Sequence, residues 1–505
     1  MIFSSLYRSD LTKLLSWCIL PDIVEQLKRE EWMKKLLWMS GLLLFLCGCV
    51  SEEKVNDYSY VSTWAKEEWS AWHGKMVLKK PADAERAEKN LAVFVRGLEL
   101  FAPYILEEYK VLDRELQLEP GTSLKRNIYG VDMTKTPVPH ECTSWIIMPE
   151  LVGGKQLILH KNRDSSSRYL TAIRGAVPGK YTWFGNGNFG TYAPTSGINE
   201  KALVVAMNSG ARTKETGEYG LYTSLMARIF LENCATVDEA IDMLGKMMEA
   251  GVYNHGKNTG SIWFFADRNG GCVVEQSAKH MYVDRLTSGL GVRGNHWTSA
   301  AMLPYSTSTP SEEMDNAIRE YHVQDSLIQQ SYNKNGIITM ADIARTCRIK
   351  DYPKYNNLYP LCGKFTNVAS TFVIDLEYPE ELSYFSSTFG PPRHGIFIPV
   401  PLTLDNLPQE MRNGAWSNEA FVRKNANKEP DQDKLAAFEA ELLTRHQQAM
   451  EKARKILQDS GDKAEAAAIL KNAFEENFKA AKAFVFTYPE KAAAPEVEKS
   501  VLSHL

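Results

Sequence analysis

The feature that most constrains the fold is a pair of short apolar runs separated by a turn signal, with a cysteine at the start. The first run, Trp145 to Met148, is β-prone, and Cys142 opens it. Gly153-Gly154 marks a turn, and a second run from Gln156 to His160 follows. It ends in the polar stretch from Lys161 to Ser165. This pattern predicts a β-hairpin in which antiparallel pairing brings the thiol beside the far end of the return strand. A thiol, a carboxylate and an amide at one sheet edge indicate a reactive site.

The two ends of this hairpin resemble the N-terminal-nucleophile amide hydrolases. The similar branch holds the penicillin acyltransferase-like peptidases (family C45), the bile salt and penicillin V hydrolases, and the acid ceramidase-like amidases. In that branch Cys-Thr or Cys-Thr-Ser begins the catalytic chain, and Asn-x-Asp follows the first hairpin. Here these motifs are Cys142-Thr143-Ser144 and Asn162-Arg163-Asp164. Two further motifs lie in family order, residues 197–208 and Gly294-Asn295-His296. Lys161 departs from the bile salt hydrolase pattern, which has Arg at this place.

Periodicity alone predicts an α+β fold, and the resemblance implies a four-layer αββα sandwich. We expect four segments: a leader at 1–49, a helical propeptide or cap at 50–141, the catalytic domain at 142–415, and a C-terminal helical extension at 416–505. Within them the patterns predict helices at 221–233, 237–250 and 315–330, β-hairpins at 261–276 and 366–386, and a helical hairpin from 434 to 485.

The leader is typical of an exported protein. Met33-Lys34-Lys35 is a short positive region, and the apolar run from Leu36 to Leu46 is well short of the ~20 residues that a membrane span requires. The sequence Leu46-Cys47-Gly48-Cys49 resembles the lipobox of a bacterial lipoprotein, with the signal peptide at 33–49. We therefore expect a lipid on Cys49 and a protein anchored in the bacterial cell envelope, at the outer membrane or in the periplasm.

The composition limits which partners and cofactors we expect the protein to bind. The net charge is −4 and no basic face is evident in the sequence, which argues against nucleic acid. No cysteine or histidine spacing fits a zinc site, so we expect no metal, and the resemblance implies no organic cofactor. Five cysteines remain after the leader, and an odd number in an exported body leaves one thiol free. Pairing of Cys347 with Cys362 stays open.

A thiol is a strong nucleophile only as thiolate, so Cys142 needs a base. The resemblance implies that its own α-amine, with a pKa near ~8, plays this part. A free α-amine requires cleavage of the Glu141–Cys142 bond, after which the two chains would stay associated. The alternative is a permanently fused helical cap, with Cys142 as a small buried apolar residue.

The resemblance also assigns the other site residues. Asp164 would anchor the α-amine or hold Cys142, although taken alone it reads as a turn residue. The Asn295 side chain and the backbone around Asn208 would donate to the oxyanion of the tetrahedral intermediate. The residues expected to face the substrate are Lys161, Arg163, His296 and, on a predicted helix, Arg319, for which a solvated helix charge is the default.

The sequence thus predicts a hydrolase or acyltransferase that cleaves a linear, small-molecule amide through a Cys142 thioester. Two alternatives remain open. Asn162-Arg163-Asp164-Ser165 also has some likeness to dipeptidases of the C69 type. A catalytically silent lipoprotein that uses the same fold to bind a ligand is the alternative from another class.

Overall fold

Two antiparallel β-sheets make the centre of the computed structural model, which describes residues 81, 83–129, 142–165, 170–188, 193–215, 220–253, 259–351 and 359–484. All of these belong to one compact unit that spans residues 59–505. The predicted leader and its Cys49 lie outside the described residues, as does Glu141.

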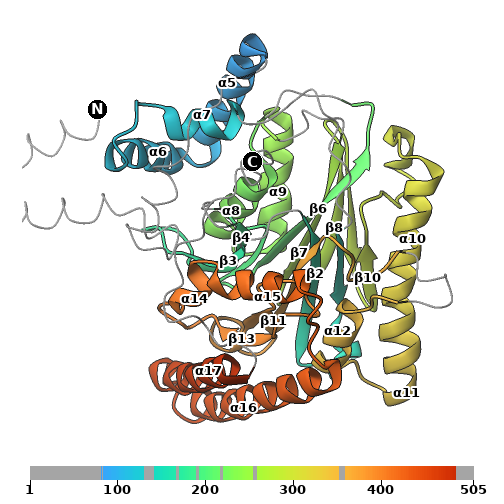
Figure 1. Cartoon of the computed structure of the whole chain (residues 1–505). Helices are drawn as coiled ribbons and strands as arrows, with labels where there is room; N and C mark the ends of the chain where they lie inside the picture. The colour runs from blue at the N-terminus through green and yellow to red at the C-terminus, as the bar shows by residue number, and fades with distance from the viewer. Residues whose placement is uncertain are drawn as a thin grey trace, which may run out of the picture. The chain divides into compact units, whose positions relative to one another are not determined.

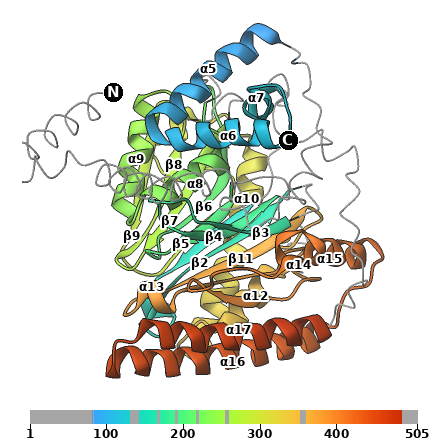
Figure 2. The same cartoon turned by 90° about the vertical axis from the view of Figure 1, so that its left-hand side faces the viewer.

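The first sheet has six strands in the order β10-β1-β2-β11-β12-β13, and the second has seven in sequence order from β3 to β9 (Figures 1 and 2). The strands of the first are β1 (Thr143–Ile147), β2 (Gln156–Asp164), β10 (Leu290–Arg293), β11 (Thr366–Asp375), β12 (Tyr384–Ser387) and β13 (Ile398–Pro401). Those of the second are β3 (Leu170–Gly175), β4 (Trp183–Asn188), β5 (Ser196–Asn199), β6 (Val204–Arg212), β7 (Thr259–Asp267), β8 (Gly270–Gln276) and β9 (Met281–Leu286).

The sheets pack face to face through one apolar core. Ile146 and Leu159 of the first sheet meet Phe184 and Phe264 of the second in this layer, and all four are buried. Because strand side chains alternate, the neighbours Trp145 and Ile158 point to the outer face of the first sheet. The strands β1, β2, β11 and β12 therefore contribute to both apolar layers, one on each face of the first sheet.

Helices cover both outer faces. Phe230 of α8 packs edge-on against Trp263 and Phe265 of the second sheet, with ring centroids 5.3 and 5.4 Å apart. On the other side, Val323 of α10 and Ile343 of α12 join the outer core of the first sheet, as do residues of the long α16 and α17. The expected αββα order is confirmed.

The helices begin and end as follows: α5 (Ala84–Phe101), α6 (Pro103–Glu115), α7 (Thr122–Tyr129), α8 (Thr223–Asn233), α9 (Val237–Glu249), α10 (Pro310–Gln324), α11 (Asn333–Asn335), α12 (Met340–Cys347), α13 (Pro379–Leu382), α14 (Gln409–Arg412), α15 (Ala415–Asn425), α16 (Gln432–Asp459) and α17 (Lys463–Phe484). Short 3₁₀ turns are η2 (Pro149–Leu151) and η3 (Leu303–Tyr305), and η4 (Asp325–Tyr332) is a π-helical segment.

The N-terminal helices are joined to the body by a buried ionic cluster. Arg228 of α8 donates two hydrogen bonds to Glu108 of α6, at 2.8 and 2.5 Å, and one to Glu232 at 2.8 Å. The hydroxyl of Tyr104, also on α6, donates to Glu232 at 2.6 Å, and Trp183 Nε1 donates to the same carboxylate. We call these five residues the Arg228 cluster.

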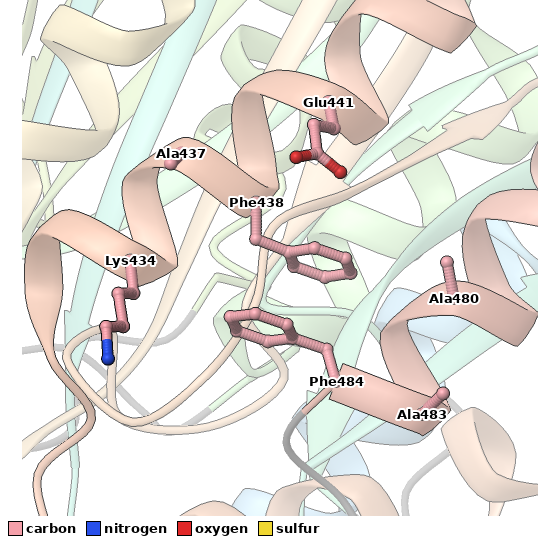
Figure 3. Close-up of a pocket in the computed structure, with 7 residues that line it drawn as sticks. All are labelled: Lys434, Ala437, Phe438, Glu441, Ala480, Ala483 and Phe484. Atoms are coloured by element: carbon pink, nitrogen blue, oxygen red, sulfur yellow. The ribbon is translucent and has the colours of Figure 1, made fainter.

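The helical hairpin at the C-terminal end is confirmed: α16 and α17 run side by side (Figure 2). Asp431 caps α16, and Gly461 has a positive φ of 72° in the turn before α17. Near its open end, Phe438 and Phe484 stack at 3.9 Å within a hollow that α16 and α17 alone line (Figure 3).

One predicted helix has different bounds and a different geometry in the structure. The expected 315–330 helix begins earlier, at Pro310, because Thr309 and Glu312 form a capping box. Its second half is π-helical from Asp325, and the Ser331 hydroxyl donates to the carbonyl of Ser326, five residues back.

Candidate active site

The predicted hairpin is confirmed and places Cys142 opposite the end of β2. Thr143 pairs with Asn162 and Ser144 with Lys161, and Cys142 directly precedes β1. By strand alternation, the side chains of Cys142, Ser144, Lys161 and Arg163 share the face that looks toward the second sheet. Cys142 is a free thiol with 6% of its surface exposed.

Lys161 lies against this thiol. Its Nζ donates to the Met207 carbonyl and, at 2.7 Å, to Asn208 Oδ1. These two acceptors engage two of the three protons of the ammonium group. Burial lowers the pKa of Lys161, whereas Cys142 and Asp164 act to raise it. The structure therefore places the charge of Lys161 on the same face as Cys142; contact with a substrate stays a prediction.

Arg163 and Asp164 complete the charged end of β2. Arg163 Nη1 donates to Asn188 Oδ1 at 3.0 Å, and burial lowers the pKa of Arg163 against the opposing pull of Cys142 and Asp164. Asp164 is buried and pairs with Thr366 of β11. Alternation turns its side chain to the face opposite that of Cys142, and the predicted role as an anchor of the α-amine remains a prediction.

Asn208 joins four segments around the thiol. Its Oδ1 accepts from Ser144 Oγ at 2.8 Å and from Lys161, and its Nδ2 donates to the carbonyls of Arg293 and Gly294 at 3.1 and 3.0 Å. Both ends of the amide are thus engaged. Asn208 holds β1, β2 and β6 to the segment that carries Asn295.

Asn295 is held on two sides. Its Nδ2 donates to the Ser209 carbonyl at 2.7 Å, and its backbone N–H donates to Asn316 Oδ1 at 2.6 Å. The predicted donation to an oxyanion stays a prediction. His296 is buried with Nδ1 3.5 Å from Glu320 Oε1, and burial lowers the pKa of His296 to about 4. It is therefore neutral near pH 7.

Arg319 belongs to the other side of β2. It is buried, and its Nη1 donates to the Pro360 carbonyl at 2.6 Å. The next carbonyl, that of Leu361, accepts from Asn162 Nδ2, as does that of Cys347. Arg319 thus holds the segment that covers the outer face of β2; its predicted contact with the substrate remains a prediction.

The layer beneath the thiol is aromatic. His160 stacks on Trp145 at 4.1 Å and shares hydrogen bonds with Thr371 Oγ1 at 2.7 Å and Asn162 Oδ1 at 3.0 Å. Burial lowers the pKa of His160 to about 3, so the ring is uncharged at neutral pH.

Sequence reasoning missed Ser144, Asn188, Asn316 and Glu320. Ser144 could have been found, because it lies two residues after Cys142 on the same strand face. The other three act from β4 and α10, and no motif marks them. The described cysteines are all free, so the pairing of Cys347 with Cys362 that the sequence left open is not formed.

Among the described residues, no three His, Cys, Asp or Glu side chains gather as a metal site would require. Nor does any helix in the described part of the chain have the length and apolar character to cross a membrane.

Several solved structures and one family model are similar to part of this chain. Two solved structures of mutant conjugated bile acid hydrolase from Clostridium perfringens are 14% and 12% identical to this chain, with TM-scores of 0.36 and 0.35. Each match covers 52% of this chain, and the two matches cover 93% and 94% of the hydrolase chains. The Caenorhabditis elegans ortholog of N-acylethanolamine-hydrolyzing acid amidase is 14% identical, covers 47% of this chain and is covered over 94%, with a TM-score of 0.31. A search of curated proteins finds no match.

One family model matches, that of acyl-coenzyme A:6-aminopenicillanic acid acyl-transferase, over residues 152–358. The matched span begins after Cys142 and contains the other predicted site residues from Lys161 to Arg319. It confirms that this chain is similar to the penicillin acyltransferase-like N-terminal-nucleophile hydrolases, as its motifs indicated.

Proposed function

We propose that the protein is an amide hydrolase or acyltransferase of the N-terminal-nucleophile class that acts on a small linear amide through a thioester on Cys142. The observation that carries the proposal is the β1–β2 register, which sets the buried Cys142 and the buried ammonium of Lys161 on the same face at the end of the motif-bearing hairpin. A cation beside sulfur favours the thiolate, which is the nucleophilic form.

The steps follow from the groups present. The Cys142 α-amine takes the thiol proton, and Sγ attacks the amide carbon, so that the C–S bond forms as the carbonyl oxygen becomes an oxyanion. The second Nδ2 proton of Asn295 donates to that oxyanion. The C–N bond then breaks, and the leaving nitrogen takes the proton from the α-ammonium. Water, or a second amine in acyl transfer, attacks the thioester and frees the thiol.

A free α-amine requires cleavage between Glu141 and Cys142, which we propose the Cys142 thiol performs. Its Sγ attacks the Glu141 carbonyl carbon, the Glu141–Cys142 C–N bond breaks to release the α-amine, and water then hydrolyses the thioester to a Glu141 carboxylate and the free thiol. The purified protein is then expected as two chains, one of which begins at Cys142. N-terminal sequencing and intact mass test this. Cys142→Ala should remain one uncut, inactive chain, whereas Cys142→Ser should cut slowly. An intact and fully active single chain would refute the mechanism.

The two chains are expected to stay together after cleavage. The Arg228 cluster supports this, because it pairs buried charges of α6 with buried charges of α8. Separation would break these charge-assisted hydrogen bonds between α6 and α8. We further propose that the precursor is exported and lipid-anchored at Cys49; the Cys47-Gly48-Cys49 motif is the support for this step.

A further inference from the structure

We propose that Glu320 and Asn316, on successive turns of α10, are positioning residues that fix the oxyanion donor Asn295. The inference rests on the proposed function, which gives Asn295 that role. It assigns to α10 a part in catalysis that the sequence motifs do not contain.

Two consecutive backbone N–H groups are bound from this helix. Gly294 N donates to Glu320 Oε1 at 2.8 Å, and Asn295 N donates to Asn316 Oδ1 at 2.6 Å. The two acceptors are four residues apart, so they project from one face of the helix. Asn316 is itself fixed, since its Nδ2 donates to the Glu312 carbonyl at 2.7 Å.

The peptide between Gly294 and Asn295 is also held from the opposite side. Asn208 Nδ2 donates to the Gly294 carbonyl, and Asn295 Nδ2 donates to the Ser209 carbonyl. A Cβ atom on residue 294 would lie only 2.4 Å from Asn316 Oδ1, so this approach requires glycine. The donor of an oxyanion hole acts only when its N–H is aimed correctly, and here β6 and α10 fix it together.

The charge of Glu320 changes in the neutral range. Burial raises the pKa of Glu320 to about 7; Arg293 and the Gly294 N–H oppose that rise, and Glu275 adds to it. His296, the other titratable group that faces it, is neutral above about pH 4 because burial lowers its pKa. A carboxylate accepts a hydrogen bond more strongly than the acid does, so the hold on Gly294 strengthens as pH rises through 7.

The test uses the cleaved protein and whichever fluorogenic N-acyl aminocoumarin amide it turns over fastest. Asn295→Ala is the reference and should lower kcat by about 100-fold. Glu320→Ala and Asn316→Ala should lower kcat by about tenfold, with KM changed less than about twofold. Glu320→Gln keeps an acceptor and should restore kcat at pH 8. It should also lose part of the rise in kcat that the wild type shows between pH 6 and 8. Met314→Ala, on the same helix but 62% exposed, is the control and should be unchanged.

The outcomes separate the two claims. If Asn295→Ala loses activity while both α10 alanine variants keep the wild-type kcat, the positioning role is wrong and the proposed function stands. If Asn295→Ala is fully active, the oxyanion assignment falls and the positioning role falls with it. If the alanine variants do not fold, the pH profile of Glu320→Gln decides, and a profile identical to that of the wild type overturns the inference.

Discussion

The Arg228 cluster allows a quantitative test of how the helical segment is held. Glu108→Gln replaces a carboxylate that accepts two hydrogen bonds from Arg228, at 2.8 and 2.5 Å, by an amide with one acceptor oxygen. The amide NH₂ would then face an N–H of the guanidinium, donor against donor. Arg228 and Glu108 are both buried, so water does not replace the lost bond.

The expected cost follows from these contacts. A hydrogen bond to a charged group contributes about 1.5–3 kcal/mol, and Glu108→Gln loses one such bond and weakens the other. Breaking a buried ion pair costs about 3–5 kcal/mol in general. Because Arg228 keeps Glu232 as a partner, we expect the low end of that range, about 3 kcal/mol.

Urea unfolding measures this in a Cys142→Ala background, where the chain is expected to remain uncut. The matched control is Glu107→Gln, its neighbour on α6, because Glu107 and Lys110 form a surface pair with side chains 66% and 70% exposed. That change should cost less than about 1 kcal/mol. If Glu108→Gln is no more destabilising than Glu107→Gln, the Arg228 cluster does not hold the segment. In the cleaved protein the same 3 kcal/mol would weaken association of the two chains by about 100-fold.

Three further predictions concern the nucleophile, the core and the leader. Lys161→Met should slow alkylation of Cys142 by iodoacetamide at pH 7 by about tenfold, and Lys161→Arg should slow it less; equal rates would show that Lys161 does not support the thiolate. Burial lowers the pKa of His446 from 6.5 in the unfolded chain to about 3 in the folded protein. Below pH 6.5 unfolding therefore binds a proton at His446, and the free energy of unfolding decreases as the pH falls. By pH 5 this amounts to about 2 kcal/mol, which His446→Phe should abolish in urea titrations at pH 8 and 5; an unchanged pH dependence would contradict it. Cys49→Ser should move the protein from the membrane fraction to the soluble fraction, and unaltered fractionation would speak against the lipid anchor.

Local patterns predicted several elements of this fold correctly. The β1–β2 hairpin follows from apolar runs around Gly153-Gly154, and the β7–β8 hairpin follows from Asn269-Gly270. The α16–α17 hairpin follows from helical periodicity broken near Gly461. Each of these signals lies within the element that it predicts or next to it in sequence.

Other elements depend on contacts that sequence does not display. Strand β4 reads Trp-Phe-Gly-Asn-Gly-Asn, which is poor in β-prone residues, yet it pairs on both sides. A Cβ on Gly185 would lie 2.5 Å from the Ser196 carbonyl, so tight strand approach explains a glycine that reads as a turn signal. In the same way, helical periodicity identifies the buried face of α10 but not that Glu320 meets Gly294. Motif order placed Cys142 and Lys161 together, whereas their hydrogen-bond partners came only from tertiary packing.

The stacked pair of Trp145 and His160 has a consequence for how the site responds to its surroundings. With its pKa held near 3, His160 adds no positive charge beneath the hairpin above about pH 4. Mild acidification therefore adds no charge to this ring. The pH response of the site in this range comes from other groups, such as the Glu320 carboxyl beside Gly294, whose pKa burial raises to about 7.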